Sequence, residues 1–331
     1  MSVKKHSKSK GIVSGIVALV ILAIAGWMLL NRQYIIDLVN YYEYQPTSTI
    51  ASFVDKASMN AQGKFLFYSA QPKLEESTDF NTSCPNYSAG SMAILGCYDG
   101  QKIYIFNVSN SQLNGIREET SAYEMLHAAY KRITGDDKTK LDALIEAEYA
   151  KQANSSTAAS VAYFAKYEPG ERDDELFSVI ATQFATISPS LESYYSRFFN
   201  DRQVLVTLYN QYSSVFTNLS TQSTDLYNQI TTLNQKIVSD KATYEQNSAQ
   251  LQTDINTFNQ DAQSGNMTQS QYNSQRAALE NRISALDADR AAINDEITNV
   301  ANLVTQYQAL ALQVQQLNQS IDSTVTAAPS L

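Results

Sequence analysis

Residues 272–293, YNSQRAALENRISALDADRAAI, begin a pattern in which every seventh residue is apolar. The pattern runs on to residue 321 through Tyr272, Leu279, Leu286, Ile293, Val300, Tyr307, Val314 and Ile321. A sustained seven-residue repeat is typical of a helix that packs along one narrow apolar stripe. We therefore predict that this part of the chain is a long helix lying against a partner helix.

A second stripe lies upstream at the same spacing, with one polar break. It consists of Tyr209, Phe216, Ser223, Ile230, Ile237, Tyr244, Leu251 and Phe258. The two stripes are symmetric about residue 265, so that Phe258 would face Tyr272. The spacing predicts an antiparallel coiled-coil hairpin over residues 201–323.

The segment between the stripes reads Ser264-Gly265-Asn266-Met267-Thr268. Gly265 suits the end of a first helix, and Thr268 with Gln271 has the spacing of a capping box that begins a second. We therefore expect the turn near residues 264–268. Apolar residues beside the stripes are expected to widen the buried seam, namely Leu226, Leu233, Ile255, Ile283, Ile297 and Val304.

At the other end of the chain, residues 11–30 form an uncharged, largely apolar run. Twenty helical residues span about 30 Å, the thickness of a hydrocarbon core. Four lysines lie in the tail of residues 1–10, and a basic excess marks the cytoplasmic side of a span. The sequence predicts a single-pass cell-membrane protein whose residues 11–30 contact the lipid bilayer and whose bulk is extracytoplasmic. A cleaved signal peptide with its site at residues 23–25 is the alternative.

The acidic balance argues against a nucleic-acid partner. The 331-residue chain has a net charge of −9, and without the four lysines of the tail the remainder carries −13. Such a surface repels phosphate backbones. We expect no nucleic acid among its partners.

Between the membrane segment and the hairpin, the pattern is mixed. A helix is expected to continue from the membrane through residues 31–47 until Pro46 ends it, and residues 48–200 are expected to form one small α+β domain. Strands are expected at 64–68, 92–98 and 102–108, with Asp99-Gly100 as a type I′ hairpin turn between the last two. Helices are expected at 48–59, 118–133, 138–151, 173–187 and 190–199, with residues 324–331 as a tail.

The only two cysteines, Cys84 and Cys97, both follow the membrane segment. In an oxidising compartment they could form a disulfide that closes a small loop and contributes roughly 3 kcal/mol. Two separately packed free thiols are the alternative interpretation.

The chemistry-bearing segment is residues 120–130, TSAYEMLHAAY, which contains His127, the only histidine beyond the membrane segment. Tyr123, Glu124 and His127 occupy the positions of His-Glu-x-x-His with the first histidine replaced. In that motif two histidines one helical turn apart hold zinc and the glutamate activates water. A serine triad that uses His127 would lack a Gly-x-Ser-x-Gly elbow.

Four stretches resemble a family of membrane-anchored zinc metallopeptidases of candidate-phylum bacteria. They are GKFLFY at 63–68, AILGCY at 93–98, EMLHAAY at 124–130 and ELFS at 175–178. The resemblance covers about half of the chain and implies a zincin-like fold with an active-site helix and an edge strand. It also implies His127 and Glu175 as metal ligands and Glu124 as general base.

Two departures from the family weaken the implied zinc site. Tyr123 and Phe177 stand where the family has histidines, which leaves Tyr123 or an acid such as Asp174 as a third ligand. Catalytic zinc usually takes three protein ligands and a water. We therefore expect an impaired metal site, no bound cofactor, and a pseudo-metallopeptidase that binds a protein or peptide, with possible self-association through the hairpin. The alternative is an active zinc peptidase that uses Glu124.

Overall fold

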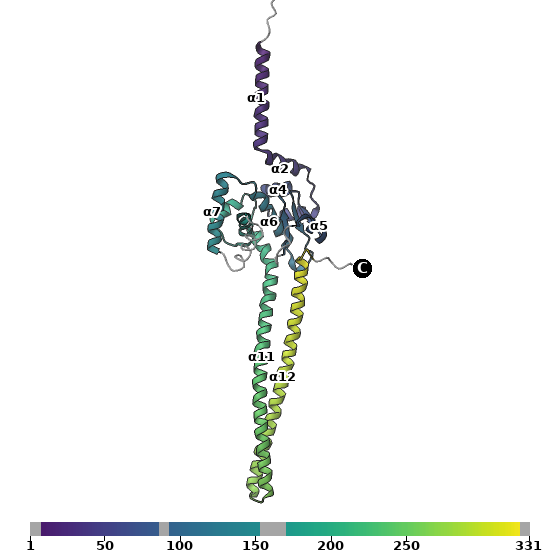
Figure 1. Ribbon diagram of the computed structural model, residues 1–331, viewed down its shortest axis with the longest axis vertical. Coiled ribbons are helices and arrows are strands. Elements are labelled where there is room, and N and C mark those ends of the chain that lie inside the picture. Colours follow the sequence, from purple (N-terminus) through teal and green to yellow (C-terminus); the bar gives the residue numbers. More distant parts are fainter. Residues whose placement is uncertain (1–7, 86–92, 153–169, 325–331) are drawn as a thin grey trace, which may run out of the picture. The chain divides into compact units, whose positions relative to one another are not determined.

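The computed structural model describes residues 8–85, 93–152 and 170–324 (Figure 1). For residues 8–15 it describes the backbone only. The described chain divides into two compact units. One comprises the residues up to Val215 together with those from Asn318 onward, and the other is Phe216–Leu317.

Helices predominate, and the sheet is small. The helices are α1 (Lys8–Leu30), α2 (Arg32–Glu43), α3 (Ser48–Lys56), α4 (Ala61–Ser69), α5 (Ser77–Ser83), the 3-10 turn η1 (Ser111–Leu113), α6 (Ile116–Tyr130), α7 (Gly135–Gln152), α9 (Arg172–Gln183), α10 (Pro189–Tyr195), α11 (Gln203–Gln263) and α12 (Gln269–Ile321). The strands are β1 (Lys73–Glu75), β2 (Gly96–Tyr98) and β3 (Ile103–Phe106).

The three strands form one sheet in the order β1-β3-β2. β3 is central, antiparallel to β2 and parallel to β1. Ile103 and Ile105 are fully buried, while Tyr104 between them is partly exposed. This alternation is the pattern of a strand with one face on a core. The expected β2–β3 hairpin is therefore confirmed, and β1 was not anticipated.

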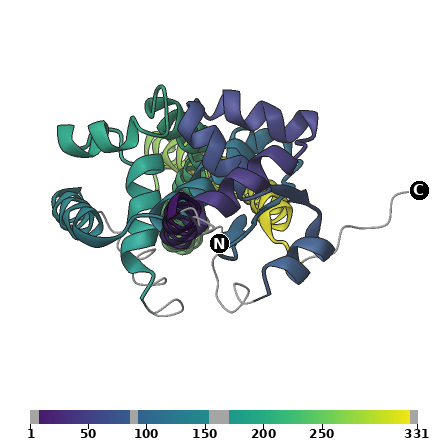
Figure 2. The ribbon, with the colours of Figure 1, turned by 90° about the horizontal axis from the view of Figure 1, so that it is seen from above.

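Helix α6 lies at the centre of the first unit. It contacts α3, α4, α9, β2 and β3. Figure 2 shows the purple-blue helices α3 and α4 on one side of this unit and the teal α7 on the other. Ala122, Met125 and Leu126 are fully buried in its core. Because α6 has so many neighbours, little of its surface is exposed. Its polar side chains are therefore surrounded by protein and not by solvent.

The predicted strand at 64–68 is wrong, because these residues belong to α4. The Asn60 side chain accepts hydrogen bonds from the backbone N–H groups of Gln62 and Gly63, at 2.9 and 3.1 Å. This cap starts a helix just before the apolar run. A run of four apolar and aromatic residues, Phe65 to Tyr68, does not by itself distinguish a strand from a buried helix.

The predicted type I′ turn is also wrong. The strands pair through Tyr98 and Ile103, and of the four residues between them only Gly100 has a positive φ, +92°. The Asp99 carboxylate accepts from the backbone N–H groups of Gln101 and Lys102, at 2.7 and 2.6 Å. This side-chain capping replaces the second positive-φ residue that a type I′ turn needs. Of the predicted strand at 92–98, only Gly96–Tyr98 is a strand, and residue 92 lies outside the described residues.

The helix expected to continue from the membrane segment instead breaks at Asn31, where α2 begins at an angle of 78° to α1. The bend lets α2 pack on α4. Asp37 of α2 is buried and pairs with Arg132 at 2.6 Å, and Asn40 donates to the Ser69 carbonyl. These contacts would be lost if α1 and α2 formed one straight helix.

Among the helices with described side chains, none alone has the length and apolar character to cross a membrane. Ile16–Leu30 and Arg32–Glu43 reach that threshold only together, as a bent pair.

The second unit is a helical hairpin, as the two stripes predicted (Figure 1). Phe258 lies against Tyr272 with ring centroids 5.2 Å apart. Arg282 of α12 donates to Asp254 of α11 at 2.6 Å, and Lys236 pairs with Glu296. Every residue of both stripes is buried or partly buried, which confirms the face that each helix turns toward the other.

The turn of the hairpin also follows the sequence. Gly265 has a φ of +75°. The Thr268 N–H donates to the Gln271 side chain at 2.9 Å, and the Gln271 N–H donates to the Thr268 hydroxyl at 3.3 Å, which is a capping box. The expected widening of the seam is confirmed at four flanking residues that are partly buried, Leu226, Leu233, Ile255 and Val304. It is wrong at Ile283 and Ile297, which are 43% and 49% exposed. Two helices alone bury only a narrow strip of each.

Candidate functional site

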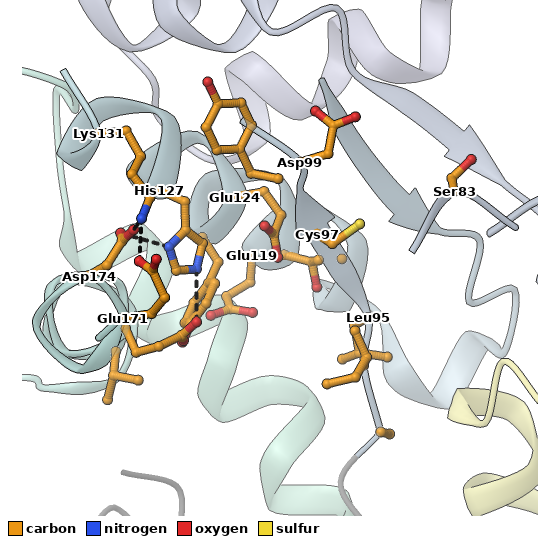
Figure 3. A pocket seen from close by; sticks show the side chains of 18 of the residues that line it. Ser83, Leu95, Cys97, Asp99, Glu119, Glu124, His127, Lys131, Glu171 and Asp174 are labelled. Atoms are coloured by element: carbon orange, nitrogen blue, oxygen red, sulfur yellow. Dashed lines mark hydrogen bonds and ion pairs between the residues drawn. The ribbon is translucent and has the colours of Figure 1, made fainter. Parts of the chain in front are cut away.

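A pocket of about 710 Å³ lies in the first unit between the loop-and-strand segment 93–100, which contains β2, and the helices α6 and α9 (Figure 3). The side chains that converge there include Tyr123, Glu124, His127, Asp174 and Glu175. Sequence analysis had singled out all five. Tertiary packing brings the three on α6 together with the two on α9, about 50 residues later in the chain. Phe177 does not line the pocket.

His127 occupies the centre of a set of carboxylates. Its Nδ1 lies 2.8 Å from Asp174 Oδ1, and its Nε2 lies 3.6 Å from Glu175 Oε1. Burial alone lowers the pKa of a histidine, but the charges of Glu175 and Asp174 outweigh it and raise the pKa of His127 to about 10. The imidazole is therefore a cation at neutral pH, held between two acids.

Tyr123, one turn before His127, donates its hydroxyl proton to Glu175 Oε2 at 2.7 Å. Burial and the neighbouring Glu175 carboxylate raise the pKa of Tyr123 well above its usual value. Burial also raises the pKa of Glu175, partly offset by His127 and by the Tyr123 hydrogen bond. The phenol thus stays protonated and serves as a hydrogen-bond donor.

Asp174 has two cationic neighbours. Besides His127, Lys131 Nζ lies 3.1 Å from its Oδ2, and Lys131 also pairs with Glu171. Although burial by itself raises the pKa of Asp174, His127 and Lys131 hold it below the usual range. Figure 3 shows this chain of interactions on one side of the pocket.

Glu124 lies on the opposite side of His127, facing β2. It is buried, and a Cβ added to Gly96 would come within 2.7 Å of its side chain. Glycine is therefore required at residue 96 for the strand to approach α6 so closely. Glu124 thus lies beside β2 and lines the pocket.

The disulfide between Cys84 and Cys97 is confirmed. It joins the end of α5 to β2 with a Cα–Cα distance of 6.2 Å, and Cys97 is 3% exposed. Because Cys97 also lines the pocket, the bond holds the strand that forms one wall of the site.

The donor set does not fit a catalytic zinc ion. Such an ion needs three protein ligands. Here Asp174 is paired with His127 Nδ1, Glu175 faces Nε2 of the same ring, and Tyr123 is protonated. Across the described ranges, no group of three or more His, Cys, Asp or Glu side chains has an arrangement suited to a metal ion. Phe177 is fully buried in the core and stacks on Tyr195 at 5.0 Å.

Sequence analysis missed Glu119, one turn before Tyr123. It is 4% exposed and lines the pocket. Its Oε2 accepts from the Tyr212 hydroxyl of α11 at 3.1 Å, while its Oε1 has no hydrogen-bond partner within the described part of the chain. The available signal was its helical spacing, since Glu119 and Tyr123 share a face of α6.

Comparisons with protein-family models, with curated proteins and with solved structures find no match to this chain.

Proposed function

We propose that this protein is a membrane-anchored, extracytoplasmic peptide-binding protein with a zincin-like site that has lost catalytic metal. In this proposal an extended peptide pairs with the outer edge of β2 and places side chains in the pocket below. The observation that carries it is that the pocket follows the whole segment 93–100, which contains an edge strand. Strand addition to an exposed edge is a recurrent mode of peptide recognition.

The hydrogen-bond register supports this role for β2. The Phe106 N–H donates to the Leu95 carbonyl, and the Asp99 N–H donates to the Lys102 carbonyl. In an antiparallel pair, bonded residues alternate with residues whose backbone groups point the other way. Gly96 and Tyr98 therefore direct their N–H and C=O groups away from β3, toward a ligand strand.

The zincin-like ancestry rests on the sequence resemblance, and the arrangement of the pocket is compatible with it. A helix carrying Glu124 and His127 lies under an edge strand, and Glu175 reaches the same point from a second helix. Loss of metal ligands with retention of the cleft would leave a binding protein. The positive charge of His127 is balanced by Asp174 and Glu175.

Membrane anchoring is supported by composition and by the exposed face of α2. The uncharged run at 11–30 follows a basic tail. The first residues after the bend expose Ile36, Val39 and Tyr42 at 39%, 48% and 78%. Apolar and tyrosine side chains suit the bilayer interface. The disulfide suits an oxidising compartment outside the cytoplasm.

Binding can be tested with the full-length chain in lipid nanodiscs and fluorescein-labelled, position-randomised heptapeptides, using anisotropy. Tyr98→Pro removes one outward N–H without removing a β2–β3 hydrogen bond, and Tyr98→Ala removes the ring but keeps the N–H. One lost hydrogen bond of about 0.5–1.5 kcal/mol corresponds to roughly 2- to 10-fold weaker binding. We expect this loss in Tyr98→Pro relative to Tyr98→Ala. Absence of saturable binding to the unmodified chain would refute the proposal.

An active zinc peptidase is the second candidate. It is favoured by one observation, that Asp174 holds His127 Nδ1 while Nε2 faces Glu175 at 3.6 Å, because metal-binding histidines commonly have a carboxylate on the other nitrogen. Stoichiometric zinc in the purified chain, together with casein cleavage that is lost in Glu124→Gln, would favour this candidate over the binding protein.

A further inference from the structure

The carboxylates of the pocket differ in what they contact. Asp174 pairs with His127 and Lys131, and Glu171 pairs with Lys131. Glu175 faces His127 and accepts from Tyr123. His127 and Lys131 are the cationic side chains among the described lining residues, and both are engaged with the acids of the α9 side.

Glu119 has no such cation beside it among the described lining residues. Its Oε2 receives a hydrogen bond from the uncharged Tyr212 phenol. The nearby Thr182 hydroxyl donates to the Ser178 carbonyl at 3.0 Å, and Glu119 Oε1 is left without a hydrogen-bond partner in the same part of the chain. Burying a carboxylate oxygen without a hydrogen bond lowers the stability of the protein. A charged donor on a ligand would supply the missing hydrogen bond.

Glu119 is buried and forms part of the pocket lining. Figure 3 shows its side chain and that of Glu124 between His127 and Cys97. Leu95 and Val179 line the same pocket. A pocket that contains both apolar residues and a buried acid suits a side chain with a methylene stem and a cationic end.

We propose that Glu119 forms the base of a subsite that takes a lysine or arginine side chain of the bound peptide, with the cationic group donating to Oε1. This inference rests on the proposed peptide-binding function, because it names the side chain that such a peptide inserts. An ammonium or guanidinium group supplies the donor that Oε1 lacks, and charge-assisted hydrogen bonds are about twice as strong as neutral ones.

The test uses the full-length chain in nanodiscs and labelled heptapeptides with capped ends, in which alanines flank a central lysine, norleucine or glutamate. A charged hydrogen bond of about 1.5–3 kcal/mol corresponds to roughly 10- to 100-fold in affinity. We expect the lysine peptide to bind more tightly than the norleucine peptide by this factor, and the glutamate peptide to bind most weakly. Glu119→Gln should abolish the preference. Glu118→Gln, a neighbour that pairs with Lys56 at 2.8 Å and does not line this pocket, should retain it.

A second measurement keeps the subsite testable without a peptide. n-Butylammonium, the lysine side chain alone, should raise the unfolding temperature of the unmodified chain more than equimolar sodium chloride does, and this excess should vanish in Glu119→Gln. Equal binding of lysine and norleucine peptides overturns the subsite while peptide binding stands. If no peptide binds, the proposed function fails, and the butylammonium result alone supports or overturns the subsite.

Discussion

His127 and Asp174, 47 residues apart in the chain, form a buried contact of 2.8 Å between Nδ1 and Oδ1. It joins α6 to α9, which pack directly on each other. With Glu175 on the other nitrogen, the pair keeps an imidazolium in the pocket wall. The site is therefore an ion-pair network with a structural cost if either charge is removed.

Asp174→Asn should destabilise the protein. Removing one partner of a buried ion pair costs about 3–5 kcal/mol. The folded pKa of His127, about 10, lies above its usual 6.5, so this stability is complete below about pH 6.5 and is lost as pH rises through 10. Urea unfolding at several pH values should show a lower midpoint for the variant at neutral pH. Asp173→Asn, at a more exposed neighbour, is the control, and an equal effect there would contradict the interpretation.

Glu119→Gln should stabilise the protein above neutral pH. Burial raises the pKa of Glu119 from 4.5 to about 7. The folded state therefore binds the proton more tightly, and ionisation lowers the free energy of unfolding as pH rises from 4.5 through 7, by up to about 3 kcal/mol.

The amide of Glu119→Gln does not ionise, so the variant should match the unmodified chain near pH 4.5 and exceed it at about pH 8. The variant and the unmodified chain share the other titratable groups around Glu119. These are Tyr123, Glu124 and Glu175 of the pocket and Tyr209 and Tyr212 of α11. Thermal unfolding at the two pH values measures the difference. A variant that is less stable at the higher pH would show that Glu119 is stabilised as a carboxylate.

Replacing Cys84 and Cys97 by serine should weaken both the fold and peptide binding. The disulfide closes a loop with a sequence separation of 13, which corresponds to about 3 kcal/mol of stability. Because Cys97 lies in β2, the edge strand should also lose order. Reduction by dithiothreitol should reproduce the double variant in thermal unfolding and in anisotropy. Unchanged affinity after reduction would show that β2 is held by the sheet and α6 alone.

Tyr123→His should create a zinc site, since a second imidazole one turn before His127 would complete three ligands with Glu175. Metal content of the purified variant measures this. Phe177→His is the matched control, because Phe177 is fully buried in the core and outside the pocket. That variant should lose stability and bind no zinc. Zinc in the unmodified chain would contradict the impaired site.

Trp27, the only tryptophan, should report membrane insertion. In bilayers containing lipids brominated on their acyl chains, we expect its fluorescence to be quenched, because the proposed span ends at residue 30. Aqueous iodide should quench it little. The reverse result would place residue 27 in water and remove the anchor.

Several elements could be predicted from local sequence because local interactions decide them. The capping box of Thr268 and Gln271 lies within one turn, and the pairing of Phe258 with Tyr272 follows from periodicity. The helix that carries Glu124 and His127 was predicted for the same reason. Strand and helix could not be separated at 64–68, because five residues are too few to show a period.

What the sequence by itself determined is the hairpin, the central helix and the residues that carry chemistry, since spacing along one helix fixes which side chains share a face. Tertiary structure alone decided that Asp174 and Glu175 neutralise His127, that Phe177 is in the core, and that Glu119 is buried with an unpaired oxygen among the described residues. These are properties of contacts between distant segments. The pKa and partner of a side chain depend on burial and on neighbouring charges, which only the packed chain defines.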